Sequence, residues 1–195
     1  MNPSDEASSI KRKNVIDMAI TFTAMSRVFE KGSKAMIAQA LEDSLAKLAS
    51  VDTRQSFERV HGDFCARFTE SISTAAKELK NKRSKNSRPA SYGHAAKVFD
   101  IAAKVYVYYC HLPSCDSAGR LMPLLHGAVD TPILRNLKAR YSESGIAAKT
   151  IEAVEEREYG ALQALVVRHI HDEFHNLILP VQYDDIMWHR LNRQP

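Results

Sequence analysis

The sequence predicts an all-α protein, and three observations support this. Glycine and proline are both scarce, with seven of each in a chain of 195 residues. The alternating apolar and polar residues of half-buried strands are absent, whereas apolar residues recur at helical spacing along most of the chain. Hydrophobic residues make up 45% of the chain and charged residues 26%, which is enough apolar surface for a sizeable core. We therefore expect residues 1–195 to form one compact helical domain.

The helical pattern divides into seven segments. We expect helices over residues 13–30, 34–49, 53–79, 92–110, 131–141, 147–178 with a break inside, and 183–192. Residues of the types that cap helix N-termini stand at Ser33, at Asp52 or Thr53, at Ser91 and at Asp130. Pro132 suits the first turn of the helix that follows Asp130. Residues 83–90 form the clearest loop, so two helical lobes that meet there are an alternative arrangement.

The predicted helix over residues 92–110 is the one against which the others should pack. From Val98 onward it is apolar on almost every side, which is typical of a helix buried among several neighbours. It nevertheless carries Lys97, Asp100 and Lys104, which helical spacing brings close to one stripe. A buried ammonium is costly unless it is paired or loses its proton, and a neutral lysine is a nucleophile. The ordinary structural explanation is an exposed ion pair between Asp100 and Lys104, with Lys97 reaching to solvent.

A second informative segment, residues 124–137, has the sequence LLHGAVDTPILRNL. An apolar run turns after Gly127 and places Asp130 immediately before an amphipathic helix. The free backbone N–H groups and the dipole of a helix N-terminus stabilise a carboxylate at this position. By itself Asp130 is a helix cap. Together with Lys97 it forms a candidate pair of amine and carboxylate.

Positive charge is concentrated just before the central helix. The net charge of the chain is only +4, but residues 77–88 have the sequence KELKNKRSKNSR, with four lysines and two arginines against one glutamate. Such a run is either a solvated loop or an edge that contacts phosphates. The second interpretation predicts DNA contacts from Lys80, Lys82, Arg83, Lys85 and Arg88.

The residues around Lys97 resemble a known family. The motif A-K-V-F-D-I-A opens a helix after a glycine-containing turn at Tyr92, Gly93 and His94. This arrangement is similar to the hairpin and second helix of the helix-hairpin-helix DNA glycosylases. The resemblance implies that Tyr92, Gly93 and His94 hold phosphates through backbone amides at the helix start. Only one glycine is present where the hairpin of the family usually has two.

The resemblance extends to Asp130. The aspartate of A-V-D-T-P looks like the aspartate of the Pro-Val-Asp loop of that superfamily, with Ala128 where the proline is usual. Lys104 and the long interval before Asp130 look most like the archaeal 8-oxoguanine DNA glycosylase branch. The matched core covers residues 91–137. The four-cysteine cluster of the iron–sulfur branch is absent from the sequence.

The family resemblance implies a function. It indicates a DNA glycosylase, bifunctional with AP-lyase activity, that flips and excises a damaged or modified base from DNA. Lys97 is then the nucleophile that forms a Schiff base, and Asp130 is the electrostatic stabiliser or base. Lys104 is a third candidate catalytic residue, which either lowers the pKa of Lys97 by repulsion or contacts a phosphate, while Asp100 balances one of the two lysines.

The substrate and its pocket are less closely defined. The base is 8-oxoguanine-like or a bulky modified base of foreign DNA, such as that of a phage, so the pathway is DNA repair or antiphage defence. Stacking on the extruded base calls for aromatic side chains. The candidates for the base pocket are Asp100, Phe174, Tyr183 and Trp188, although aromatic residues are more often part of a core. We expect no cofactor.

Two other hypotheses compete with the glycosylase. His171 and His175 have the i,i+4 spacing by which two imidazoles on one helix bind a metal, and His169 and Glu173 add potential ligands. Third ligands would come from distant histidines, namely His111, His126 or His189. This predicts a metal-dependent hydrolase or a metal sensor. The third hypothesis is a non-catalytic helical DNA-binding protein in which Lys97 is a phosphate contact.

Cysteine usage and hydropathy predict a cytoplasmic protein. Cys65, Cys110 and Cys115 are an odd number without metal spacing, which fits a reducing compartment. Residues 1–14 are polar and charged, and no apolar run approaches the roughly 18 residues that indicate a membrane span. We therefore expect neither a signal peptide nor a membrane partner.

Overall fold

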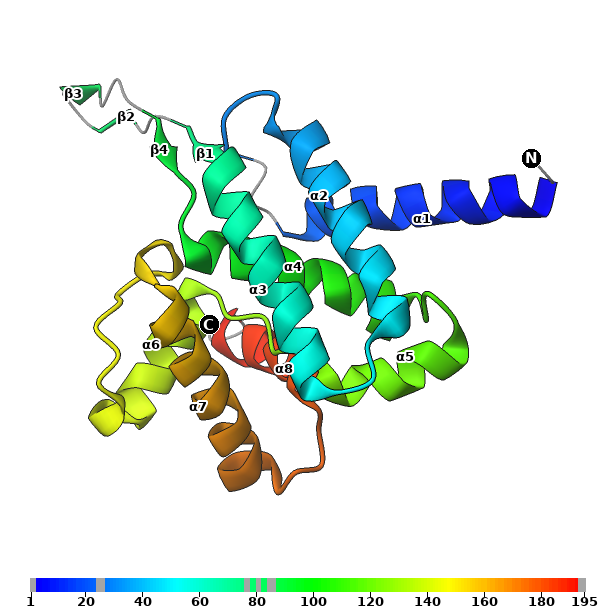
Figure 1. The fold of residues 1–195 in the computed structure, drawn as a ribbon. Coiled ribbons are helices and arrows are strands. Elements are labelled where there is room, and N and C mark those ends of the chain that lie inside the picture. The colour runs from blue at the N-terminus through cyan, green and yellow to red at the C-terminus, as the bar shows by residue number, and fades with distance from the viewer. Residues whose placement is uncertain (1–2, 24–26, 76–77, 80–81, 84–86, 193–195) are drawn as a thin grey trace.

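Helix α4 (Tyr92–Ala103) lies at the centre of the molecule, as its apolar surface predicts (Figure 1). The computed structural model describes residues 3–23, 27–75, 78–79, 82–83 and 87–192. Four other helices pack on α4, namely α1 (Pro3–Phe22), α2 (Ser33–Lys47), α3 (Arg54–Ser71) and α7 (Glu156–Phe174). The all-α prediction is confirmed.

The remaining helices of the described residues lie below α4 in the view of Figure 1. These are α5 (Cys115–Leu121), α6 (Thr131–Arg140) and α8 (Pro180–Asn192), with 3₁₀ turns η1 (Leu48–Ser50), η3 (Met122–Leu124), η4 (Ser142–Ser144) and η5 (Ile151–Ala153). Buried apolar side chains from α1 to α8 form one continuous cluster. Within the described residues, no helix has the length and apolar character needed to cross a lipid bilayer.

Three of the predicted caps are confirmed. Thr53 and Ser91 each accept a hydrogen bond from a backbone N–H of the first turn, and both form reciprocal capping boxes. Asp130 caps α6 by accepting a hydrogen bond from the Ile133 N–H, without a reciprocal bond. The cap predicted at Ser33 is wrong, because Gly32 is the N-cap and Ser33 is the first residue of α2. Gly32 adopts a positive φ of 98°, which an L side chain rarely tolerates.

The connection between α3 and α4 differs from the prediction. Helix α3 ends at Ser71 rather than at residue 79, and a narrow ribbon follows. Strand β1 (Ser73–Thr74) pairs antiparallel with β4 (Arg88–Pro89), and β2 (Glu78–Leu79) pairs with β3 (Lys82–Arg83). Strands of two residues are too short to leave an alternating pattern in the sequence. A helix-hairpin-helix element before α4 is therefore not confirmed.

Other boundaries shift for local reasons. α5 is seven residues long, too short for helical periodicity to be recognised. The end of α4 continues as a π-helical segment, η2 (Lys104–Tyr109), in which the hydrogen-bond spacing widens. α1 begins at Pro3 instead of residue 13, and α7 begins at Glu156 rather than at residue 147.

The start of α4 is packed closely against η5. The Gly93 N–H donates to the carbonyl oxygen of Val154 at 3.1 Å. A Cβ added at Gly93 would lie 2.0 Å from the carbonyl oxygen of Ile151, so only glycine fits here. Gly93 therefore allows the start of α4 to pack directly against the backbone of η5.

Candidate functional site

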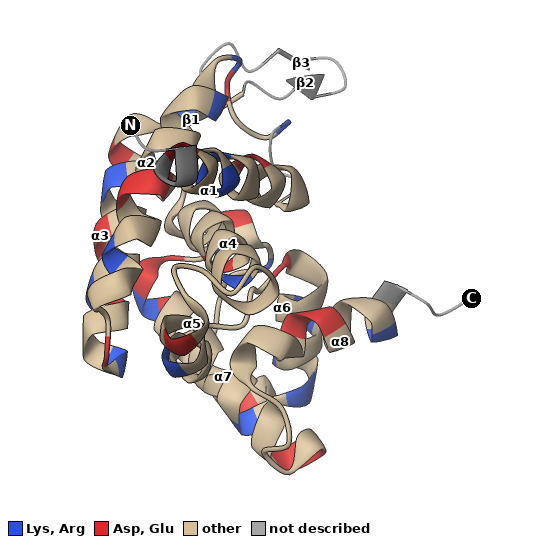
Figure 2. Ribbon diagram, turned by 90° about the vertical axis from the view of Figure 1, so that its right-hand side faces the viewer, with Lys and Arg blue, Asp and Glu red and all other residues tan. Residues whose placement is uncertain are grey.

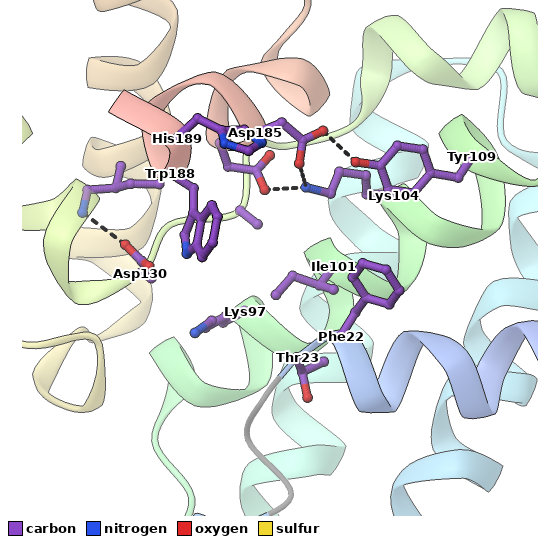
Figure 3. Close-up of a pocket in the computed structure, with 13 residues that line it drawn as sticks. Phe22, Thr23, Lys97, Ile101, Lys104, Tyr109, Asp130, Asp185, Trp188 and His189 are labelled. Carbon is purple, nitrogen blue, oxygen red and sulfur yellow. Dashed lines mark hydrogen bonds and ion pairs between the residues drawn. The ribbon is translucent and has the colours of Figure 1, made fainter. Parts of the chain in front are cut away.

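A pocket of about 440 Å³ opens between α4, α6, α8 and the end of α1 (Figure 3). Lys97 on α4 and Lys104 at the start of η2 line it, together with Asp130 at the start of α6 and Trp188 on α8. Lys97 and Asp130 are distant in sequence, and the fold brings them to one cavity. Phe22 of α1, which the sequence does not single out, also lines the pocket.

Lys97 is a partly buried amine that has no close counter-ion in the described part of the chain. Burial lowers the pKa of Lys97, and attraction to Asp130 and Asp184 opposes this only in part. Among the described residues, both carboxylates act on Lys97 through space rather than through a hydrogen bond. Near neutral pH, Lys97 therefore carries a larger fraction of neutral amine than an exposed lysine does.

Asp130 is held in place by a rigid segment. Its Oδ1 accepts a hydrogen bond from the Ile133 N–H at 2.9 Å, which fixes the carboxylate at the start of α6. Gly127 lies three residues before Asp130. The Gln163 side chain accepts a hydrogen bond from the Gly127 N–H at 3.2 Å and donates one to the Gly127 carbonyl oxygen at 2.9 Å. A Cβ at Gly127 would lie 2.8 Å from the carbonyl oxygen of Pro180. The carboxylate is thus positioned by packed backbone rather than by a loose loop.

Lys104 is a charged partner of two acids on α8. Its Nζ forms ion pairs with Asp184 and, at 2.8 Å, with Asp185 (Figure 3). The Tyr109 hydroxyl donates to Asp185 at 2.6 Å. Burial alone would lower the pKa of Lys104, but these ion pairs raise it. The prediction that Lys104 lowers the pKa of Lys97 by repulsion is therefore wrong, because two carboxylates neutralise the charge of Lys104.

Asp100 lies on another side of α4, which corrects its predicted place in the base pocket. Three residues turn a helix by about 300°, so Asp100 is about 60° from Lys97 around the axis. It is fully buried towards α3 and α7, where the Tyr159 hydroxyl donates to its Oδ2 at 2.7 Å. Asp100 therefore balances neither lysine, and the expected exposed pair of Asp100 with Lys104 is also wrong.

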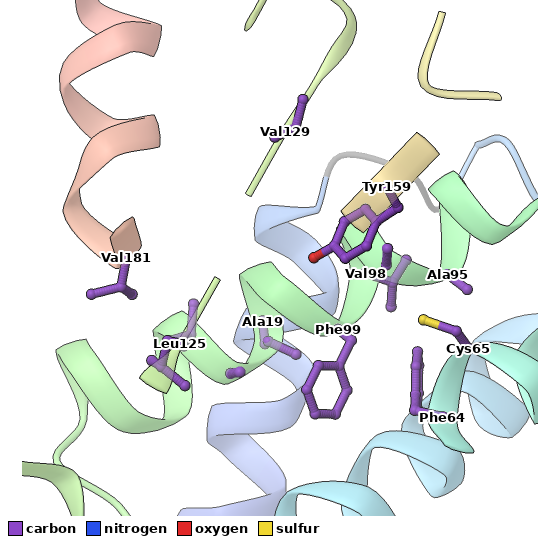
Figure 4. Packing of buried hydrophobic residues seen from close by; sticks show 14 of the residues in the cluster. Ala19, Phe64, Cys65, Ala95, Val98, Phe99, Leu125, Val129, Tyr159 and Val181 are labelled. Atoms are coloured by element: carbon purple, nitrogen blue, oxygen red, sulfur yellow. The ribbon is translucent and has the colours of Figure 1, made fainter. Parts of the chain in front are cut away.

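Asp100 belongs to a second, buried polar cluster. His61 Nε2 lies 3.3 Å from Asp100 Oδ1, and His126 Nε2 lies 2.8 Å from Glu58 Oε1. Burial alone would lower the pKa of His126, but the neighbouring carboxylates of Asp100 and Glu58 raise it to about 9. Figure 4 shows Tyr159, a member of this cluster, beside the apolar side chains that surround α4. No local spacing in the sequence could have revealed the cluster, because its members are scattered over a hundred residues.

Of the three predicted stacking residues, Trp188 alone lines the pocket, with 52% of its surface exposed. Tyr183 is fully buried, and its hydroxyl bonds His169 Nδ1 at 2.6 Å. Phe174 packs against Tyr183 and lies beneath the Arg190 guanidinium. Tyr183 is therefore a core residue and Phe174 a partly buried residue packed against the core, and the prediction that they lie in the base pocket is wrong.

The predicted phosphate-binding amides are used inside the protein. The Gly93 N–H bonds Val154, and the His94 N–H bonds the Ser91 hydroxyl at 3.2 Å. Tyr92 packs its ring against His61 and Tyr159. The prediction that this turn binds DNA phosphates through its amides is therefore wrong, because both N–H groups already donate to acceptors within the protein.

The basic run is only partly described. Arg88 is exposed on β4, and the backbone of Lys82 and Arg83 forms β3. Lys80 and Lys85 lie outside the described residues. On the described elements, Figure 2 shows Lys and Arg interspersed with Asp and Glu. The DNA contacts expected from this run stay a prediction.

The His171 and His175 metal hypothesis is not supported by the geometry. α7 ends at Phe174, and His175 has a left-handed backbone with φ of 50°, so the two imidazoles do not share one helical face. His171 is exposed and pairs with its neighbour Asp172 at 3.0 Å. Glu173 pairs with Arg140. The i,i+4 spacing fails because the helix stops one residue too early.

No protein-family model, curated protein or solved structure matches this chain. The resemblance of residues 91–137 to the helix-hairpin-helix DNA glycosylases therefore stays a prediction from sequence motifs.

The contrast between the two lysines predicts opposite effects on stability. Replacement of Lys104 by methionine should lower the free energy of unfolding by about 3 kcal/mol, because it leaves two acids without their buried counter-ion. Replacement of Lys97 by methionine should leave the free energy of unfolding unchanged within about 1 kcal/mol or raise it, because an unpaired ammonium no longer has to be buried. Urea denaturation of both variants measures the difference. Equal losses in the two variants would contradict this account of Lys97.

Proposed function

We propose that the protein is a DNA glycosylase with AP-lyase activity, which accepts an extruded damaged or modified base and releases it. The observation that carries the proposal is the joint presence of Lys97 and Asp130 in one pocket, with burial lowering the pKa of Lys97. An amine with a lowered pKa and a fixed carboxylate are what nucleophilic base excision requires.

The dimensions of the pocket support a nucleoside as its occupant. Its volume of about 440 Å³ lies within the range of about 300–1,000 Å³ that is usual for small-molecule sites. The exposed indole of Trp188 offers a face on which a flipped base can stack. The base is 8-oxoguanine-like or bulky and modified, and DNA is the partner, with Arg88 and the neighbouring basic residues as phosphate contacts.

The chemistry uses the two residues in separate roles. The glycosidic bond breaks, and its electron pair leaves with the base, which takes a proton. The Lys97 nitrogen bonds to C1′ and loses a proton, and the Asp130 carboxylate stabilises the positive charge that develops at C1′. Cleavage of the C1′–O4′ bond, with a proton to O4′, leaves an imine. Loss of a C2′ proton then expels the 3′ phosphate and cuts the strand.

The Schiff base can be tested without knowledge of the base. Wild-type protein incubated with abasic-site DNA and borohydride should form a covalent adduct, because hydride reduces the imine to a stable amine. Lys97→Gln should abolish the adduct, as measured by gel shift and by mass mapping of the DNA-linked peptide.

Matched controls separate this outcome from general lysine reactivity. Lys149→Gln removes an exposed lysine and should leave the adduct yield unchanged. An adduct that persists in the Lys97 variant, or that maps to another lysine, would show that Lys97 is not the nucleophile. Salt-sensitive DNA binding without any adduct would instead favour the non-catalytic DNA-binding protein.

The lowered pKa of Lys97 predicts the pH dependence of trapping. The ammonium is unreactive, so the initial rate on abasic-site DNA should rise with pH and level off once the amine is neutral. Because burial lowers the pKa of Lys97, the midpoint should lie below the value of about 10.4 for an exposed lysine. Initial rates of trapping with cyanoborohydride measure this profile. A midpoint at or above the ordinary lysine value would contradict the environment described for Lys97.

Asp130→Asn separates the electrostatic role of Asp130 from its structural role. Asparagine is as good an N-cap as aspartate, so α6 should keep its start and the melting temperature should change little. Base release should slow by about a hundredfold or more, because the positive charge at C1′ loses its carboxylate. Release of free base from a panel of oligonucleotides with oxidised and bulky modified bases gives the rate. An undiminished rate would remove Asp130 from the mechanism.

A further inference from the structure

The buried cluster around Asp100, about 60° from Lys97 around the α4 axis, presents three potential metal ligands. His61 comes from α3, Asp100 from α4 and His126 from the segment before α6. One ligand atom from each lies within 4.8 Å of the others. Asp100 Oδ1 is 3.3 Å from His61 Nε2 and 3.7 Å from His126 Nδ1. Two ligands about 2.0–2.1 Å from a tetrahedral ion are roughly 3.3 Å apart, a separation that the Asp100–His61 pair matches and the Asp100–His126 pair exceeds by a few tenths of an ångström.

The hydrogen bonds of the cluster leave one oxygen unexplained. Tyr159 donates to Asp100 Oδ2 at 2.7 Å and contacts His126 Nδ1 at 2.8 Å. Asp100 Oδ1 is fully buried and has no hydrogen-bond partner among the described residues, although both imidazoles face it. A buried carboxylate oxygen without a donor is costly, and it marks a position where a positive group is expected.

We infer that His61, Asp100 and His126 bind a divalent transition-metal ion, with zinc the best match to the donors. Two imidazole nitrogens and one carboxylate oxygen suit borderline ions such as Zn²⁺ or Fe²⁺ better than Mg²⁺ or Ca²⁺, which prefer oxygen alone. The ion accepts the lone pair of Asp100 Oδ1, the atom that lacks a donor. Tyr159 offers a further oxygen at the edge of the site.

The surroundings of the three ligands match those of a metal centre. His126 Nε2, the nitrogen that points away from Asp100, bonds Glu58 at 2.8 Å, which is the carboxylate–histidine–metal arrangement that orients a ligand. His61 Nδ1 faces Cys65 Sγ at 3.8 Å. The three ligand residues are at most 4% exposed. Such a closed site has a structural role, in which the ion joins α3, α4 and the segment that carries Asp130.

Metal binding by the full-length protein is the direct test. Chelator-treated protein titrated with Co²⁺ should develop the visible absorption of a low-symmetry cobalt site and saturate at a single ion per chain, which Zn²⁺ then displaces. Bound zinc should also raise the melting temperature. X-ray absorption of the loaded protein should show imidazole and oxygen neighbours. Failure of the wild-type protein to bind Zn²⁺, Co²⁺, Mn²⁺ or Fe²⁺ in stoichiometric amount would overturn the inference.

Variants assign the ligands. Asp100→Asn keeps the shape of the side chain and an oxygen for Tyr159, and it should weaken Co²⁺ binding at least a hundredfold, as should His61→Gln. His171→Gln, at an exposed histidine outside the cluster, should bind cobalt like the wild type. Unchanged binding in Asp100→Asn, or sulfur in the X-ray absorption of the wild type, would overturn the ligand set. The wild-type measurements decide whether the protein binds a metal ion even if a variant does not fold.

Discussion

The constraint on which this structure depends is the placement of two lysines and an aspartate, Lys97, Lys104 and Asp100, on a helical segment that is buried almost all round. Charge inside an apolar core must be compensated, and the neighbours of α4 are arranged to do so. Two acids of α8 pair with Lys104, and the imidazoles of α3 and of the segment before α6 face Asp100. Lys104 and Asp100 are therefore each compensated by side chains of the elements that pack on their side of the helix.

The segment 125–130 links the two sides of α4. His126 points into the buried cluster, and Asp130, four residues later, lines the pocket. Gln163 holds the backbone between them through both polar groups of Gly127. This connection fixes both the rotation of α4 about its axis and the path of the segment. The contacts of Asp100 therefore also determine how Lys97 is placed relative to Asp130 in the pocket.

Sequence reasoning recovers what local patterns encode. The all-α fold, the central place of α4 and the caps at Thr53, Ser91 and Asp130 follow from periodicity and capping chemistry. The short strands of the ribbon and α5 have too few residues for a period to be recognised. The Asp100 cluster was missed for another reason. Its partners are distant along the chain, and a rotation of about 60° around a helix decides whether a side chain joins the pocket or the core.

Lys97 and Lys104 form an internal comparison, since both are lysines on one continuous helical segment and line the same cavity. Where the fold requires a charged lysine, it supplies two carboxylates at ion-pairing distance. Lys97 is instead partly buried with no ion pair among the described residues, and Asp130, the acid that attracts it most, caps a helix. This placement disfavours the charged form, and no residue in the described part of the chain compensates it at ion-pairing distance, so packing alone does not account for it. The proposed role of Lys97 as a nucleophile would account for it, because the burial that is unfavourable for an ammonium is what makes the nitrogen nucleophilic.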